Sequence, residues 1–157
     1  MAAKPKDPAR YTEMRNAKAH RDYFIHDKFE AGVKLSGTEV KSIRAGKAQL
    51  TDAFARVEKG EVWLYGAYIE EYSHGGISQH APRRPRKLLL HASEIRKLTQ
   101  EVETAGRSIV ALRMYFKEAL VKVEIATASG KKQFDKREDL KRREQNLEAR
   151  RALRTSR

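Results

Sequence analysis

Hydrophobic and polar residues alternate over several short stretches of this sequence. Between Phe29 and Leu35 every second position is hydrophobic, which predicts a strand with one face on a core. Similar alternation or a short apolar run predicts further strands at 22–26, 54–58, 62–69, 88–90, 109–116 and 120–126. Lys59-Gly60 is a suitable hairpin turn between two of them. So many short strands with few helices favour a small closed β barrel over a doubly wound sheet.

Two short helices are predicted between the strands. The first follows Ser36, which has capping-box spacing to Glu39, and it ends where Gly46 can form a left-handed cap. The second covers 95–105, where hydrophobic residues recur at helical spacing, and it ends at Gly106. Both helices are expected to cover the ends of the barrel.

The segment of the first helix has two glycines and a following lysine, as a phosphate-binding loop does, but the spacing of the glycines is different. Eight residues separate Gly37 from Gly46, and Ala48 stands where a Walker loop needs Ser or Thr. The exposed side of the helix carries three basic residues that can meet a macromolecular anion: Lys41, Arg44 and Lys47.

The segment after Gly130 differs from the rest of the chain. Its leucines, at 140, 147 and 153, are too sparse for a stripe that packs on a core. Glu, Lys, Arg, Gln and Ala dominate it, so it can become helical on a partner while staying disordered when free.

The charge is concentrated at the two ends of the chain. The 157 residues carry a formal net charge of +13, which suits nucleic acid or an anionic membrane surface as partner. Residues 1–21 hold six basic and two acidic side chains, and residues 131–157 hold eleven and five. A nearly balanced body with basic extensions is typical of RNA and ribosome binders. No apolar run approaches membrane-spanning length and there is no cysteine, so we expect a cytoplasmic protein without membrane contact.

Candidate chemistry is sparse. The five histidines form neither an HxxxH nor an HExxH pair, so surface or structural roles are favoured over a metal site. Asp22, Asp27 and Glu30 could form a nuclease cluster, but strand alternation separates them and salt bridges explain them better. We therefore expect no catalytic residue, no metal and no cofactor.

The loop at 83–87 is a better candidate for binding. Its four basic residues follow or flank prolines that would hold the chain extended as a phosphate-facing edge: Arg83, Arg84, Arg86 and Lys87. A solvated basic loop is the alternative. Glu30 and Lys122 are polar residues on the outward side of predicted strands, and each taken alone is more often a plain surface residue.

Five segments of the chain together resemble one family. The small protein B (SmpB) family, whose members are partners of transfer-messenger RNA, has in the same order segments like NAKAHRDYFI, FEAGVKLSGTEVKSIRAGKAQLTDAF, RKLLLH, YFKEALVKVEI and GKKQFDKRED. The resemblance covers residues 16 to about 143, and its most specific run is Phe29 to Ala48.

The resemblance implies both a fold and a function. Members have a six-stranded antiparallel closed barrel of the OB type with about three short flanking helices. They are adaptors rather than enzymes: they bind the tRNA-like domain of transfer-messenger RNA (tmRNA) and deliver it to stalled ribosomes. The tail then enters the decoding region and the empty mRNA channel. We accordingly expect a monomer with a basic arm at 1–18, an OB-type RNA-binding domain at 19–129 and a tail at 130–157 that is disordered when free.

The resemblance also implies functional residues. Positions implicated in RNA binding are Asn16, Glu30, Leu89 and Lys122. The tail motif that engages the decoding region matches Gly130, Lys131, Lys132, Asp135, Lys136 and Arg137. The chain departs from the pattern at His20-Arg21, where the order is reversed, and at Phe134, which replaces a Tyr or His.

Two other functions stay open from the sequence. A structural ribosomal protein that binds ribosomal RNA permanently has a similar composition. An RNA-processing enzyme is disfavoured because no acid–base or metal cluster is evident.

Overall fold

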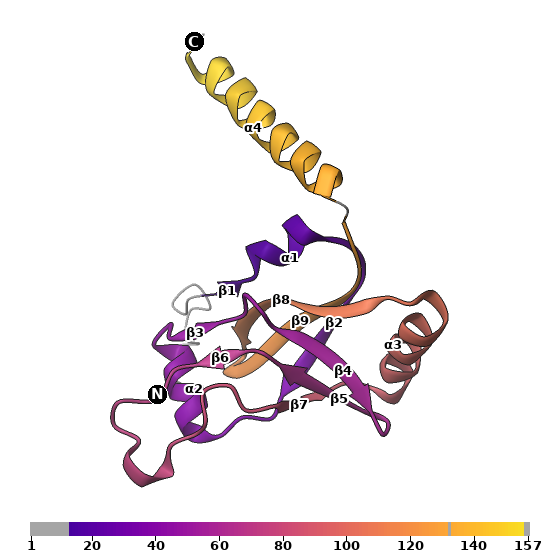
Figure 1. Cartoon of the computed structure of the whole chain (residues 1–157). Helices are drawn as coiled ribbons and strands as arrows, with labels where there is room; N and C mark the ends of the chain where they lie inside the picture. The colour runs from indigo at the N-terminus through magenta and orange to yellow at the C-terminus, as the bar shows by residue number, and fades with distance from the viewer. Residues whose placement is uncertain (1–12, 132, 156–157) are drawn as a thin grey trace.

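The computed structural model describes residues 13–131 and 133–155 (Figure 1). Along the chain its elements are β1 (Met14–Arg15), α1 (Ala17–Asp22), β2 (Tyr23–Val33), α2 (Gly37–Arg44), β3 (Ala48–Gln49), β4 (Phe54–Glu58), β5 (Glu61–Tyr65), β6 (Tyr68–Ile69), a 3-10 turn (Gly76–Ser78), β7 (Arg86–Leu89), α3 (Ala92–Ala105), β8 (Ser108–Lys117), β9 (Leu120–Gly130) and α4 (Gln133–Thr155). The chain is thus mainly β with several short helices, as the alternation predicts.

Seven strands form one antiparallel sheet. Their order is β1-β8-β4-β5-β7-β2-β9, and β8 pairs in addition with β9. Strands β3 and β6 form a separate two-stranded ladder. Figure 1 shows α2 and α3 at opposite ends of the strands, while α4 projects away from the sheet.

The longest pairing joins β2 to β9. It runs from Tyr23 opposite Gly130 to Gly32 opposite Lys122, with an irregularity between Ile25 and Lys28. The two strands predicted at 22–26 and 29–35 are therefore one strand with a bulge. The sequence pattern broke there because a bulge changes which face the next side chain occupies.

The core lies on the inner side of the curved sheet. Ala31, Val123 and Ile125 are fully buried there, which confirms the alternation predicted for β2 and β9. A smaller cluster lies on the outer side, where Ala19 of α1 covers residues of β8 and β9: Val110, Leu112, Ala126 and Ala128. Helix α1 thus closes one half of the outer face and leaves the other half open.

The local signals predicted at the helix and hairpin ends are confirmed. The backbone N–H of Ser36 donates to Glu39 Oε1 at 3.0 Å, which completes the capping box of α2. Gly46 and Gly106 have φ angles of 77° and 65°, in the left-handed region that favours glycine. Gly60 has a φ angle of 76° in the β4–β5 turn.

The turn between β8 and β9 uses no glycine. Glu118 and Ala119 have φ angles of 51° and 68°. A non-glycine residue in this region destabilises the folded state by roughly 1–2 kcal/mol. Glycine would remove this strain, but its greater conformational freedom in the unfolded chain offsets part of the gain in stability. Ala119→Gly is therefore expected to raise the free energy of unfolding by about 0.5–1 kcal/mol in urea titrations.

The matched control for this turn is Ala105→Gly. Ala105 is the exposed last residue of α3, so the same replacement there should lower stability by up to about 1 kcal/mol. If both variants lost stability equally, the strain at Ala119 would be refuted.

Candidate nucleic-acid interface

The open half of the outer face carries a row of residues from four strands. Leu89 of β7 lies opposite Gly32 of β2, Gly32 opposite Lys122 of β9, and Lys122 opposite Tyr115 of β8. Leu89 is 53% exposed despite its place in a run of leucines. A Cβ atom added to Gly32 would lie 3.3 Å from the Leu89 Cβ, so the glycine lets the Leu89 side chain pack closely against the backbone of β2.

Glu30 organises the charged end of this row. Tyr115 Oη donates a hydrogen bond to its carboxylate, and Lys117 Nζ lies 3.1 Å from Oε1. The bond from Tyr115, followed by that from Lys117, lowers the pKa of Glu30. Burial, followed by the hydrogen bond to Glu30, raises the pKa of Tyr115 to about 12. Glu30 is therefore an acceptor that fixes two neighbouring donors, and its carboxylate is already occupied.

Arg113 supports the other side of Tyr115. Its guanidinium carbon lies 4.4 Å from the centre of the tyrosine ring, and its nitrogens reach Glu124 and Glu13 at 3.0 Å each. A guanidinium stacked on a ring and held by two carboxylates keeps the ring in one orientation. Tyr115, Lys117 and Arg113 were not singled out from the sequence, although alternation with Met114 and Phe116 places Tyr115 on the outer face.

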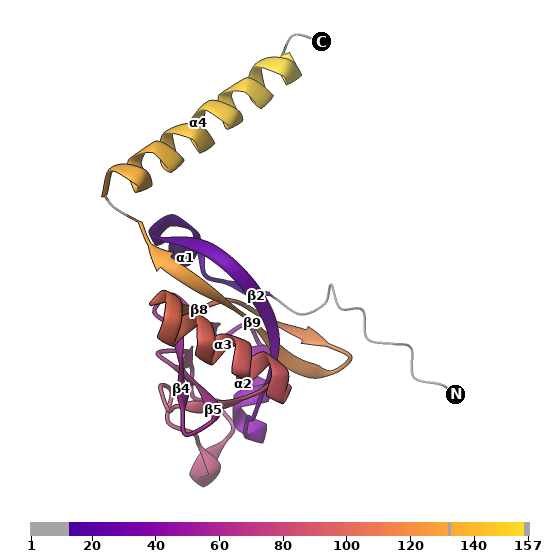
Figure 2. The same ribbon diagram turned by 90° about the vertical axis from the view of Figure 1, so that its right-hand side faces the viewer.

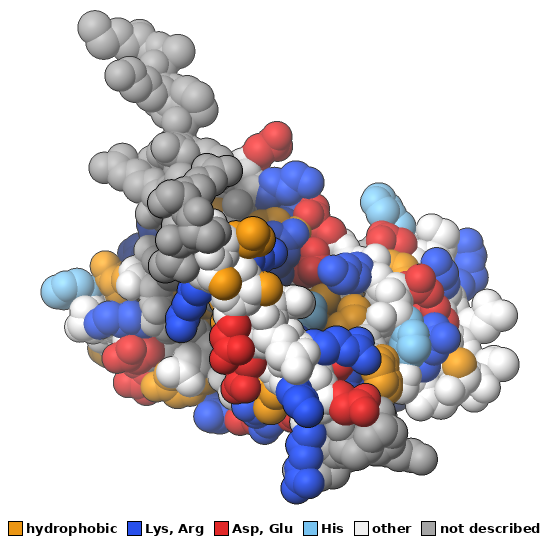
Figure 3. Space-filling model, turned by 90° about the horizontal axis from the view of Figure 1, so that it is seen from above, with side chains coloured by type: hydrophobic (Ala, Val, Ile, Leu, Met, Phe, Trp, Pro, Cys, Tyr) orange, Lys and Arg blue, Asp and Glu red, His pale blue; other side chains and the backbone are white. Residues whose placement is uncertain are grey.

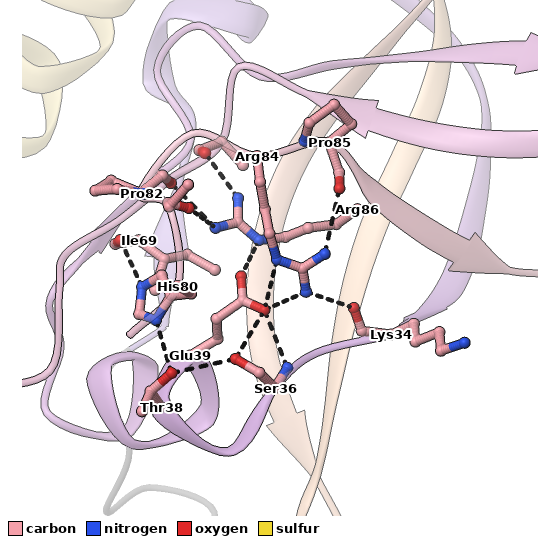
Figure 4. Close-up of polar contacts among 12 residues, drawn as sticks. Lys34, Ser36, Thr38, Glu39, Ile69, His80, Pro82, Arg84, Pro85 and Arg86 are labelled. Carbon is pink, nitrogen blue, oxygen red and sulfur yellow. Dashed lines mark hydrogen bonds and ion pairs between the residues drawn. The ribbon is translucent and has the colours of Figure 1, made fainter. Parts of the chain in front are cut away.

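The basic loop is only partly what the sequence suggested. Arg86 is fully buried, and with Arg84 it binds the carboxylate of Glu39 (Figure 4). Arg83 is exposed, with its guanidinium over the Tyr68 ring, and Lys87 is half-buried beside Glu61 at 3.1 Å. The expectation that Arg86 faces phosphate is wrong, because Arg86 begins β7 on the inward side together with Leu88.

Glu39 joins helix α2 to this loop. Besides the two arginines, it accepts the Ser36 N–H, while Arg86 donates to Ala67 O at 2.9 Å and Pro82 O at 3.0 Å. Burial by itself raises the pKa of Glu39, but the bonds from Arg84, Ser36 and Arg86 outweigh it and hold the pKa below its ordinary value. The network therefore fixes the course of the loop, and only its partly exposed member Arg84 can still meet a ligand.

His80 completes the attachment of the loop. Its ring nitrogens lie 2.9 Å from Thr38 Oγ1 and 3.0 Å from Ile69 O, and the side chain is buried. This histidine has a structural role, as expected from the lack of a metal-binding pattern.

The basic side of α2 is exposed, as predicted. Lys41 lies over the Tyr72 ring at 5.4 Å, and Arg44 lies over the Phe116 ring at 5.8 Å. Lys47 follows the helix and is also exposed. Because Phe116 is close to the β8–β9 turn, α2 lies at the end of the sheet that carries Tyr115 and Lys122.

Asn16 is not an exposed contact. It is only 3% exposed; its Nδ2 donates to Ala111 O at 2.8 Å and its Oδ1 accepts from Ala19 N at 3.2 Å. The amide therefore caps α1 and ties it to β8. The interpretation as a direct RNA contact is not supported by this burial, since both ends of the amide are used within the protein.

The predicted tail motif starts at the end of β9. Gly130 is exposed, whereas the Lys131 side chain is only 6% exposed: its Nζ donates to His20 O at 3.2 Å and pairs with Asp139. Lys132 lies outside the described residues. Asp135 and Lys136 lie near the start of α4, and Arg137 is exposed.

The C-terminal segment is helical in the structure. Residues 133–155 form one helix, and of the side chains from 137 to 153 all are exposed except the half-buried Asp139. Strong helix formers account for the helix, since little packing supports it. Mobility of this segment in the free protein stays a prediction.

Two broader properties concern the described part of the chain. Within it, no three His, Asp or Glu side chains gather as a metal ion would require. None of its helices is long and apolar enough to cross a membrane. Seen from above, basic and acidic side chains are interspersed over the surface (Figure 3).

The fold and this outer face define a small, basic, antiparallel β protein with a charged and aromatic strand surface. The family model described as "SmpB protein" matches residues 13–155, and the chain belongs to the SmpB family.

Curated relatives and a solved structure agree with this family. An SsrA-binding protein of Thermobifida fusca is 53% identical over 146 residues, which are 93% of this chain and 91% of the relative. An SsrA-binding protein of Syntrophobacter fumaroxidans is 53% identical over 133 residues, 85% of this chain and 83% of the relative. A chain from the structure "tmRNA-SmpB: a journey to the center of the bacterial ribosome" matches with a TM-score of 0.64 and 46% identity, over 81% of this chain and 87% of that one.

Proposed function

We propose that this protein is an RNA-binding adaptor of trans-translation. It binds the tRNA-like domain of tmRNA and delivers it to stalled ribosomes, where rescue and peptide tagging follow. The observation that carries the proposal is the match to SmpB over residues 13–155, together with the SmpB chain solved with tmRNA. The protein acts in the cytoplasm, as a monomer, and without catalysing a reaction itself.

The sheet is the platform for this function, and we propose that it is a closed barrel of the OB type. The pairings support closure, because the path from β8 through β4, β5, β7, β2 and β9 returns to β8. A closed path leaves no long unpaired edge, and strand faces of OB barrels are common nucleic-acid surfaces. The alternative of a structural ribosomal protein has no observation here that favours it.

The RNA surface is the open half of the outer face. Lys122 and Leu89 offer a charge and an apolar side chain on either side of Gly32, and Glu30 holds Tyr115 and Lys117 beside them. Folded RNA is recognised by shape, phosphate contacts and stacking, for which this mixture is suited. The generic phosphate contacts are Arg83, Lys41, Arg44 and Lys47, with a smaller share for the half-exposed Arg84 and Lys87.

Lys122→Ala is expected to weaken binding of the tRNA-like domain about tenfold, which corresponds to one lost charged hydrogen bond. A random RNA duplex should lose less, because it does not fit the row. The measurement is a pair of binding curves at one salt concentration. The matched control is Lys59→Ala, since Lys59 is exposed at the β4–β5 turn. Equal losses for both RNAs would reduce Lys122 to a generic phosphate contact.

A further inference from the structure

A hollow of about 520 Å³ lies between α1, β2, β8 and α4, next to the surface just described. Six elements each contribute one charged or titratable residue to its border: Arg15, His20, Lys28, Arg113, Glu124 and Arg143. Helix α4 passes close to α1, and Arg143 is the residue through which α4 reaches this border.

The charge of this border is strongly one-sided. Among the described residues Glu124 is its only carboxylate, and Arg113 already occupies it at 3.0 Å. Arg15 pairs only with Glu13, at 3.4 Å on the exposed surface, where such pairs are weak. Lys28 and Arg143 have no carboxylate partner among the residues that the structure describes. The hollow therefore carries an excess of positive charge, although Glu13 and Glu124 offset part of it at Arg15 and Arg113.

The same cationic side chains affect the pKa of His20. Its pKa is lowered by burial and then by the charges of Lys28 and Arg143; Lys131 acts in the same direction, while Glu124 opposes them. A bound anion would reverse these repulsions. Lys28 and Arg143 border the same hollow as His20, so both can act on a group bound there.

We propose that this hollow binds a phosphate group of the RNA backbone, and that the tail contributes to the site through Arg143. The inference rests on the proposed RNA-binding function and adds a site to it. Lys28 lies two residues before Glu30 on β2, and Arg113 two residues before Tyr115 on β8. An RNA strand that crosses the row at Lys122 therefore meets the hollow on the same outer face. Four cationic side chains around one opening suit a phosphodiester, whose charge they share.

The site also connects the RNA to the position of the tail. Lys131 fixes the start of the tail through Asp139 and His20 O, and Arg143 lies one helical turn beyond Asp139. A phosphate held by Lys28 from the body and by Arg143 from the tail stabilises α4 against α1. Figures 1 and 2 show that α4 otherwise stands away from the sheet.

The test is the salt dependence of binding to the tRNA-like domain of tmRNA. Each lost phosphate contact reduces the slope of log K against log salt by about 0.9. Lys28→Gln and Arg143→Gln in the full chain should each reduce the slope by about that amount. The control is Arg142→Gln, since Arg142 is the neighbouring exposed arginine on α4 and does not border the hollow.

The outcomes separate the site from the function. If the unaltered chain does not prefer this RNA over ordinary tRNA, the proposed function fails. If it does, but Lys28→Gln and Arg143→Gln change the slope no more than Arg142→Gln, the site alone is refuted. If Lys28→Gln reduces the salt slope but Arg143→Gln does not, the contribution of the tail is refuted. All three residues are exposed, and melting temperatures equal to that of the parent verify that the fold is intact.

A second readout does not depend on RNA. Histidine NMR titration of the full chain should show the pKa of His20 rising when inorganic phosphate is added. The same addition should leave the ring chemical shifts of His91 unchanged, because His91 is exposed at the start of α3 and does not border the hollow. Equal responses of both histidines would refute a phosphate site beside His20.

Discussion

Glu39→Gln is expected to lower the free energy of unfolding by about 3–5 kcal/mol, because it leaves a buried arginine without its counter-charge. Glu39 and Arg86 both have fully buried side chains, and Arg84 is the only partly exposed member of the trio. Glutamine keeps the size of the side chain, so the loss reports on charge rather than on packing. Urea unfolding followed by circular dichroism measures it.

The control for this variant is Glu61→Gln, which removes the negative charge from a solvent-accessible ion pair with Lys87. That pair should contribute less than about 1 kcal/mol, since solvent screens it. Similar losses for the two variants would contradict a structural role of the Glu39 network.

The stability contribution of Glu39 is also expected to depend on pH. The pKa of Glu39 is lowered in the folded protein from an ordinary value of 4.5. Its contribution is therefore fully present above about pH 4.5 and is lost as the pH falls through the lower folded pKa. The stability difference between the parent and Glu39→Gln should shrink between pH 5 and pH 3. A constant difference over that range would refute the role of the carboxylate charge.

Local chemistry explains which parts of the fold could be predicted. The strand from Val121 to Ile125 and the turn at Lys59-Gly60 depend on neighbours in sequence, and both are confirmed. The capping box between Ser36 and Glu39 is confirmed for the same reason. Elements of two residues, such as β1 and β3, were missed because they exist only through pairing with distant strands.

The candidate site shows the limit of sequence patterns more clearly. Arg86 belongs to a basic run, yet 47 residues separate it from the Glu39 that buries it. Asn16 likewise meets Ala111 across 95 residues. Only Arg86 had a usable local signal, since it alternates with the buried Leu88. For Asn16 the cap on α1 is local, but the bond to Ala111 has no such signal, because that partner is a backbone carbonyl.

A chain ending at Gly130 is expected to bind the tRNA-like domain within about tenfold of the full chain, yet to support no peptide tagging on stalled ribosomes. The row at Lys122 stays intact in it, and the Arg143 contact is the only loss expected at the RNA surface, worth about one unit of salt slope. The tail itself packs little on the body, so its removal should not change the melting temperature. Binding curves and a tagging assay on a truncated message, run side by side, measure both effects.

Within the tail, the first turns of α4 should carry most of this function. Ordering a residue costs roughly 1–2 kcal/mol, so the exposed helix needs ribosomal contacts to hold it in one place. Replacing Asp135, Lys136 and Arg137 by alanine should reduce tagging at least tenfold, while RNA binding stays normal. The control replaces Arg142, Glu144 and Arg150 by alanine, which changes the net charge equally but lies further along α4. If both triple variants reduce tagging alike, total charge determines the role of the tail; if the truncated chain tags normally, the tail has no part in rescue.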